Sequence, residues 1–167
     1  MAPITPTERK PSERGAALVE FALVLPLLLV VIAGIVDFGF VFQRYEVITN
    51  AAREGARIAM LPGYESNTDV VKQRVRDYVQ FGLSLSNTAL DTVVPVGNIT
   101  VDYHTMTVAG AGGTSYDVPV AEVSVFYNHQ FMLLGPMLGL INKTWGQSIT
   151  LKGNSQMRQE LAAPAGS

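Results

Sequence analysis

One long apolar stretch near the N-terminus constrains this chain more than any other feature. Residues 21–36 read FALVLPLLLVVIAGIV without a charged residue, and Glu20 and Asp37 bound the run. As an α-helix rising about 1.5 Å per residue, residues 16–36 would cover roughly 30 Å, which is the thickness of a bilayer's hydrocarbon core. We therefore expect one transmembrane helix followed by a domain outside the bilayer.

A second apolar segment, Phe131–Ile141, is too short to span a bilayer. Its Gly135–Pro136 pair also predicts a break in any helix formed there. Two interpretations of this segment stay open, which are burial under a sheet and contact with a partner protein.

The composition excludes several classes of protein. The 167 residues contain no cysteine, so a disulfide framework, a zinc knuckle and a thiol nucleophile are ruled out. A net charge of −2 with 16% charged residues does not suit nucleic-acid binding, which needs a basic face. Since 48% of the residues are hydrophobic, the chain as a whole is not expected to be disordered.

Residues 1–15 form a polar leader rich in proline, which we expect to be unstructured. It carries Arg9, Lys10 and Arg14. Basic residues before a first transmembrane helix favour a cytoplasmic N-terminus. Although arginines also follow the span, we expect the C-terminal domain to lie outside the cytoplasm.

Three hypotheses describe this N-terminus. The first is a signal anchor that is never cleaved. The second is a secretory signal peptide cleaved after Ala33, because Val31-Ile32-Ala33 fits the small-x-small rule. The third is a prepilin-type leader cleaved after Gly15, so that the mature chain starts at Ala16 and carries Glu20 as its fifth residue, followed by Phe21.

The position of Glu20 has a physical cost. A carboxylate near lipid is unfavourable by about 2–4 kcal/mol unless it is paired. In an assembling filament the α-amino group of a neighbouring chain could neutralise it. The alternative is an interfacial residue that reaches into the headgroups, and the Gly-x4-Glu spacing alone does not decide between them.

Several motifs follow one another at a defined spacing between Arg14 and Ala59, and together they resemble the TadE-like family, the minor pseudopilins of the Tad (tight adherence, Flp) pilus system. They are the Gly15/Glu20-Phe21 site, Pro26 within the span, Asp37-Phe38-Gly39, and Ala51-Ala52-Arg53-Glu54-Gly55-Ala56-Arg57. The resemblance implies a substrate of a prepilin peptidase that is anchored by one helix in the cytoplasmic (inner) membrane. It also implies a role in priming or capping pilus assembly, by insertion of this helix among other pilin-like helices.

The resemblance further implies partners and no small-molecule substrate. The partners are the major Flp pilin, a sister pseudopilin of the TadF type, the aspartyl prepilin peptidase, and the platform and ATPase of the Tad system. The alternative function is an uncleaved, single-pass periplasmic binding or scaffold protein. A secreted enzyme released after Ala33 is a third class, without a candidate site.

The spacing of apolar and small residues beyond the span predicts that the helix continues. They recur every three or four positions, at Val41, Tyr45, Ile48, Ala52, Gly55 and Ala59. We expect the long helix to cover residues 16–61 and to end before Pro62-Gly63.

Two features of this helix concern packing. Small residues four apart let another backbone approach closely, either from the protein's own sheet or from another helix; they are Ala51, Ala52, Gly55, Ala56 and Ala59. Pro26 removes one hydrogen bond within the span, so a kink is expected there.

The remaining residues, 62–167, predict an extracytoplasmic α+β domain. A second helix is expected at about Asp69–Phe81, capped from within residues 66–69 and ended by Gly82, with Val71, Val75, Tyr78 and Val79 as its buried face. Alternation predicts strands around residues 99–104 and 121–127, joined by a hairpin loop at Ala109–Ser115, and a last short strand at Ile149 and Leu151. A helix followed by an antiparallel sheet is the α+β arrangement of pilin-like folds.

No motif predicts catalysis, a cofactor or a metal. His104 and His129 are the only histidines, and no carboxylate stands at metal-ligand spacing from either. The glycine-rich loop at residues 110–113 lacks the Lys-Ser/Thr of a phosphate loop. Asp102 and Glu122 are expected on the solvent face of their strands.

Overall fold

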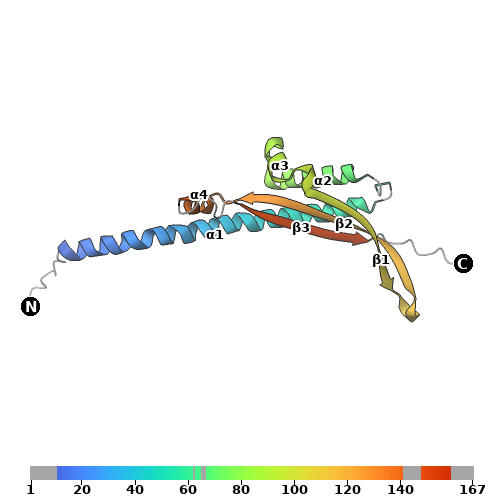
Figure 1. Ribbon diagram of the computed structural model, residues 1–167, viewed down its shortest axis with the longest axis horizontal. Helices are drawn as coiled ribbons and strands as arrows, with labels where there is room; N and C mark the ends of the chain where they lie inside the picture. Colours follow the sequence, from blue (N-terminus) through green and yellow to red (C-terminus); the bar gives the residue numbers. More distant parts are fainter. Residues whose placement is uncertain (1–10, 62, 65–66, 141–147, 159–167) are drawn as a thin grey trace, which may run out of the picture.

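The computed structural model describes residues 11–61, 63–64, 67–140 and 148–158. One long helix, α1 (Pro11–Ala59), forms the axis of the molecule, and the other elements pack around its C-terminal half (Figure 1). Its N-terminal half projects from this domain. Within the described residues the fold is α+β, as predicted.

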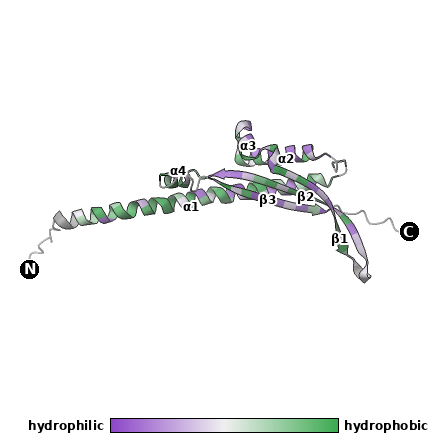
Figure 2. Ribbon diagram, viewed as in Figure 1, coloured by the Kyte–Doolittle hydropathy of each residue, from purple (hydrophilic) through white to green (hydrophobic). Residues whose placement is uncertain are grey.

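The projecting half of α1 is apolar and unburied. None of the side chains of residues 15–32 is buried within the chain, and Figure 2 shows mainly hydrophobic residues along this half. The helix is long and apolar enough to cross a membrane. It continues through Pro26, where a kink was expected, without a break in its helical assignment.

The bounds of α1 differ from the prediction at both ends. The helix already begins at Pro11, so residues 11–15 of the expected unstructured leader are helical. Proline suits the first position of a helix, because its ring fixes φ and the missing N–H has no helical partner there. The helix ends at Ala59 instead of Leu61, and Tyr45 in the predicted apolar stripe is exposed.

Helix α2 (Thr68–Leu83) packs beside α1 and buries Val71, Val75 and Val79, as predicted. The Asn67 side chain caps its first turn by accepting a hydrogen bond from the Val70 N–H. Two details were wrong, since Tyr78 is exposed and Gly82 does not end the helix.

The end of α2 is made by another residue. Ser84 adopts the left-handed conformation, with φ of 51°, and closes the helix. Gly82 instead lies inside the helix where it meets α1, because a Cβ added there would stand 2.8 Å from Cγ1 of Val47. A short helix that was not predicted, α3 (Asn87–Val93), follows and is capped by Ser86.

Three antiparallel strands form the sheet of the described residues, in the order β1 (Ile99–Ala109), β2 (Ser115–Gln130) and β3 (Ser148–Arg158). The short 3-10 turn η1 (Val96–Asn98) leads into β1. The predicted hairpin is confirmed, because Ala109 pairs with Ser115 around the turn η2 (Ala111–Gly113). The last strand is much longer than expected, since β3 pairs with β2 along its whole length.

The core lies between the C-terminal half of α1, α2 and one face of the sheet. Alternate residues of β2, including Val123, Val125 and Tyr127, face it. The sheet approaches the helix closely at Gly153, where a Cβ would stand 2.7 Å from the backbone oxygen of Ile48. This packing holds the sheet against the C-terminal half of α1, whereas none of the side chains of residues 15–32 is buried.

The apolar segment at residues 131–140 is not buried under the sheet, and the helix break expected at Gly135–Pro136 does not occur. It contains a short helix, α4 (Leu134–Gly139), which rests against the middle of α1 (Figure 1). Gly135 and Pro136 stand in its first turn, where a missing N–H costs no helical hydrogen bond, so the pair does not prevent the helix. Ile141 lies outside the described residues.

Candidate functional site

The residues of the predicted processing site lie at the free end of α1. Gly15, Ala16, Glu20 and Phe21 are all exposed, and a Cβ added at Gly15 would meet nothing within 4 Å. Ala16 and Glu20 are four residues apart, so they lie on the same face of the helix. The residues are therefore accessible to a protease or a partner helix.

The small residues of α1 lie at its other end and pack within the chain. Ala51, Ala52, Ala56 and Ala59 are fully buried. A Cβ on Gly55 would stand 2.5 Å from Cγ2 of Val75 in α2 and 3.2 Å from Cγ1 of Val123 in β2. The stripe thus brings α2 and the sheet close to α1, which is the first of the two arrangements considered from the sequence.

Asp37 marks the junction between the projecting half of α1 and the domain. Its side chain is fully buried, and its two carboxylate oxygens accept hydrogen bonds from the backbone N–H groups of Met132, Leu133 and Leu134, at 3.1, 3.0 and 2.7 Å. Burial of a carboxylate is costly unless such donors compensate it. The side chain therefore fastens the start of α4 to α1.

Sequence reasoning did not predict this role for Asp37. The residue was used as the boundary of the apolar run and as part of a family motif. The position of Asp37 in the sequence could have indicated this role, since a carboxylate directly after a membrane-spanning run needs a partner. The identity of the donors, which lie about 95 residues further on, could not be read from that position.

A row of aromatic contacts continues from this junction along β2. The Phe38 ring meets Phe131 edge-on at 6.4 Å between centroids, and Phe131 meets His129 at 5.5 Å. His129 stacks on Tyr127 at 6.5 Å, and the Tyr127 hydroxyl accepts a hydrogen bond of 3.0 Å from Nε of Arg44. Such contacts contribute to stability beyond the buried area alone. Because Phe38 and Arg44 both belong to α1, the row connects the end of β2 to α1 at each of its two ends.

His129 is buried in this row, and its Nε2 has no hydrogen-bond partner among the described residues. Burial lowers the pKa of the imidazole, the positive charge of Arg44 lowers it further, and the charge of Asp37 opposes both effects. The net effect favours the neutral form of the side chain. The described residues contain no group of three His, Cys, Asp or Glu side chains that could hold a metal ion.

The other polar residues singled out from the sequence lie on the sheet. His104 pairs with Val120, and Asp102 pairs with Glu122, across β1 and β2. The Glu122 carboxylate accepts hydrogen bonds from the side chains of Asn154 and Gln156, which lower the pKa of Glu122. These contacts stabilise the surface of the sheet and suggest no chemistry.

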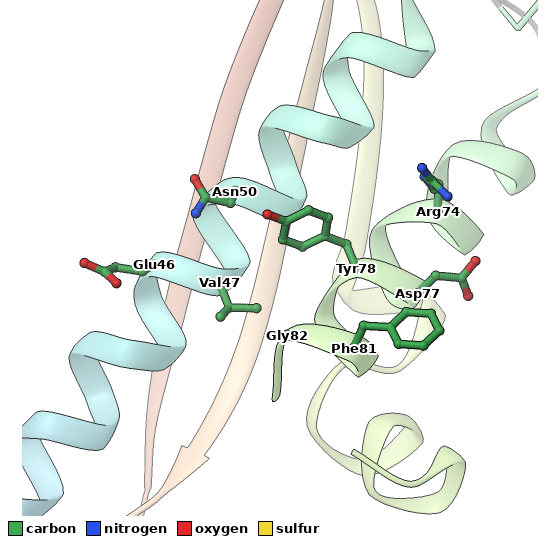
Figure 3. Close-up of a pocket in the computed structure, with 8 residues that line it drawn as sticks. All are labelled: Glu46, Val47, Asn50, Arg74, Asp77, Tyr78, Phe81 and Gly82. Atoms are coloured by element: carbon green, nitrogen blue, oxygen red, sulfur yellow. The ribbon is translucent and has the colours of Figure 1, made fainter. Parts of the chain in front are cut away.

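A groove of about 560 Å³ lies between α1 and α2 (Figure 3). Glu46, Val47 and Asn50 line it from α1, and residues of α2 line the opposite wall. The Tyr78 ring points across it toward α1, whereas Phe81 lies at its rim with 83% of its surface exposed. The groove is open and of mixed polarity.

Comparison with known proteins matches the N-terminal part of the chain. Residues 15–57 match the family model of TadE-like proteins. This part of the chain is similar to TadE-like proteins. The match confirms the resemblance inferred from residues 14–59 and contains Gly15, Glu20 and Asp37, whereas α2 and the sheet lie outside it. No match was found to a curated protein or to a solved structure.

The geometry and the match together define two regions. The projecting half of the TadE-like segment is an exposed apolar helix that needs lipid or other helices around it. The buried half is the support on which the α+β domain packs. Asp37 stands at the boundary between the two.

Proposed function

We propose that this protein is a minor pseudopilin that primes or supports assembly of a Tad/Flp pilus. The observation that carries the proposal is the projecting half of α1. Its residues 15–32 are mainly apolar with none buried, they carry Gly15 and Glu20 near the free end of the helix, and they lie within the TadE-like match.

One exposed helix suits both stages of the proposed role. Before assembly the apolar side chains of residues 16–36 contact lipid in the cytoplasmic membrane. During assembly they exchange lipid for other pilin-like helices, namely the Flp major pilin and a TadF-like pseudopilin. Because one apolar environment replaces another, this exchange has no large hydrophobic cost.

Processing supplies the charge that Glu20 needs. Cleavage after Gly15 by a prepilin peptidase would expose a new α-amino group on Ala16. At about 4 Å from such a group on a neighbouring chain, the carboxylate would gain a few kcal/mol at an effective dielectric near 20. The pairing therefore favours a neighbour in the correct register.

The proposed orientation has the N-terminus in the cytoplasm and the α+β domain outside, where the Tad platform can deliver it to a growing pilus. Alkaline phosphatase fused after Ser167 is expected to be active. An inactive phosphatase fusion with an active cytoplasmic reporter at the same site would reverse the orientation.

The test of the function is the mature N-terminus. Co-expression with the cognate prepilin peptidase is expected to give a product that starts at Ala16, identified by mass spectrometry. Gly15→Leu is expected to block cleavage, whereas Gly39→Ala, a matched glycine change on the same helix, is expected to be cleaved normally. A product that starts at Gly34 would show an ordinary signal peptide and refute the proposal.

An uncleaved binding or scaffold protein is the alternative, and the groove between α1 and α2 favours it. In that case the full-length chain would persist beside the active peptidase. Phe81→Asp at the rim of the groove would then impair function, while Gly15→Leu would not. The pseudopilin proposal expects the reverse.

A further inference from the structure

The segment at residues 131–140 presents apolar side chains to its surroundings. Met132 is 68% exposed and Leu140 is 89% exposed, and Leu133 is also exposed. The sequence FMLLGPMLGL contains no charged residue. An apolar segment left exposed in this way indicates a contact with something outside the chain.

From the position of this segment we infer that α4 and its flanking residues dock into the outer leaflet of the bilayer that α1 crosses, as a second and interfacial membrane contact. The segment packs on α1 at the end of the apolar run. Cδ1 of Leu134 lies 4.0 Å from the place where a Cβ on Gly34 would stand, and Asp37 binds the backbone of the same turn.

The depth of this segment in the bilayer follows from the rise of α1 per residue. Gly34 lies 18 residues after Ala16, which at about 1.5 Å per residue is roughly 27 Å along the helix. If Ala16 marks the cytoplasmic boundary of a hydrocarbon core of about 30 Å, Gly34 lies just inside the outer boundary. The turn that packs on Gly34 is therefore at the depth where acyl chains meet headgroups.

The hydrogen bonds of the turn fit this environment. A backbone N–H without a partner is costly where water is scarce. Asp37 satisfies the N–H groups of Met132, Leu133 and Leu134. The turn can therefore enter the interface without leaving these donors unpaired.

Lipid is favoured as the occupant because the two apolar surfaces are continuous. Figure 2 shows α4 as a hydrophobic element that lies directly against the hydrophobic half of α1. The contact between them is at Gly34 and Asp37, where the apolar run of α1 ends. Polar side chains begin on the other side of the segment, since Asn128 and Gln130 are exposed at the end of β2. This order of apolar and polar residues matches an interfacial segment.

The absence of cysteine from the sequence makes the test direct. Met132→Cys and Leu140→Cys are labelled with an environment-sensitive fluorophore in the full-length protein, reconstituted into phosphatidylethanolamine–phosphatidylglycerol vesicles. The probes are expected to show blue-shifted emission and to lose fluorescence when lipids carry a quencher near the top of the acyl chain. Thr105→Cys, exposed on β1, is the matched control and should show neither effect.

A probe at Val24→Cys in the apolar run separates this inference from the membrane anchor on which it depends. Quenching at Val24 without quenching at Met132 and Leu140 would overturn the interfacial contact and leave the anchor intact. Val24 lies about 12 Å along the helix from Ala16, so it is tested with a quencher near the end of the acyl chain, and no quenching there would overturn both. Protection of Met132 and Leu140 only in assembled pili, with none in vesicles, would make the segment a pilin contact and refute the lipid contact.

A substitution gives a second readout. Leu140→Asp changes a side chain that is almost fully exposed, so the fold should be kept. It is expected to reduce quenching at Met132→Cys, because a carboxylate resists transfer into the interface. Phe81→Asp, an equally exposed apolar side chain on α2, is expected to leave the quenching unchanged, and an equal loss in both variants would contradict the proposal.

Discussion

The carboxylate of Asp37 accepts a hydrogen bond of 2.7 Å from the backbone N–H of Leu134, a residue 97 positions later in the chain. The bond joins the end of the apolar run to the turn that follows the central strand. Together with the aromatic row from Phe38 to Tyr127, it fixes where the sheet meets the projecting helix.

Asp37→Asn is expected to destabilise this junction. The amide keeps the size of the side chain but offers one oxygen, and its NH2 group would face backbone N–H donors. Loss of charged hydrogen bonds to buried donors costs about 1–3 kcal/mol. Hydrogen exchange of the amides of Met132, Leu133 and Leu134 should become faster, and the midpoint of denaturant unfolding should fall.

Asp117→Asn is the matched control for this change. Asp117 is exposed and accepts a hydrogen bond of 2.7 Å from the Thr107 hydroxyl. An exposed pair of this kind contributes little, so the free energy of unfolding should change by less than about 1 kcal/mol. Equal losses from Asp37→Asn and Asp117→Asn would show that the buried junction has no special role in stability.

Gly55→Ala is expected to destabilise the packing of α1. The new methyl group would meet Cγ2 of Val75 at 2.5 Å. Overpacking of this kind costs about 1–3 kcal/mol, which exceeds the gain in helix propensity. Gly39→Ala, with nothing within 4 Å of the new Cβ, should stabilise the helix by about 0.5–1 kcal/mol. The unfolding free energies of the two variants check the sign, and stabilisation by Gly55→Ala would contradict the close packing.

The burial of His129 predicts a pH dependence of stability. Its pKa in the folded state is lowered from the model-peptide value of 6.5, chiefly by burial. Below about pH 6.5 the unfolded chain therefore binds more protons at this site than the folded chain, so folding becomes less favourable as the pH falls toward the folded-state pKa. Above about pH 6.5 the imidazole is neutral in both the folded and the unfolded chain, so His129 no longer makes stability depend on pH.

His129→Phe should reduce this dependence. Phenylalanine keeps an aromatic ring between Tyr127 and Phe131 but cannot bind a proton. Denaturant unfolding from about pH 8 to about pH 5 should show a smaller loss of stability for the variant than for the native protein. Parallel curves for the two proteins would mean that His129 is already accessible to protons in the folded state.

The sequence predicted the elements whose signal is local. The apolar run, the three-and-four spacing that continues it and the valines of α2 each repeat within a few residues, so α1 and α2 were found. The hairpin followed from a glycine-rich loop between alternating segments. The TadE-like match then confirmed the family motifs within residues 15–57.

The features that were missed depend on contacts between distant residues. Gly82 does not end α2 but lies close to the side chain of Val47, and this is decided by the packing of α1 against α2. The position of α4 depends on Asp37, whose partners are given by the register of the sheet and not by neighbouring residues. For the same reason the length of β3 could not be read from Ile149 and Leu151 alone, because it is set by pairing with β2.

Glu20 gives the most direct test of the proposed assembly role. Its side chain is exposed at the free end of α1, within the TadE-like match. Glu20→Gln keeps the shape and removes the charge, whereas Glu20→Leu also removes the polarity. Both variants should still insert, and both should still be cleaved if the peptidase recognises mainly Gly15. Both should leave cells with few or no pili, because a neighbour's α-amino group then has no carboxylate to pair with.

The measurement is the number of pili together with the cleaved fraction, in cells that carry only the variant protein. Glu46→Gln, at another exposed glutamate of α1, is the matched control and should leave both quantities unchanged. The two substitutions at Glu20 also separate charge from membrane affinity, since Leu makes residence in the bilayer more favourable and Gln much less so. If loss of pili follows the charge, both fail alike. If it follows retention in the membrane, Leu fails and Gln assembles. Full piliation with Glu20→Leu would make the carboxylate an interfacial residue without a docking role.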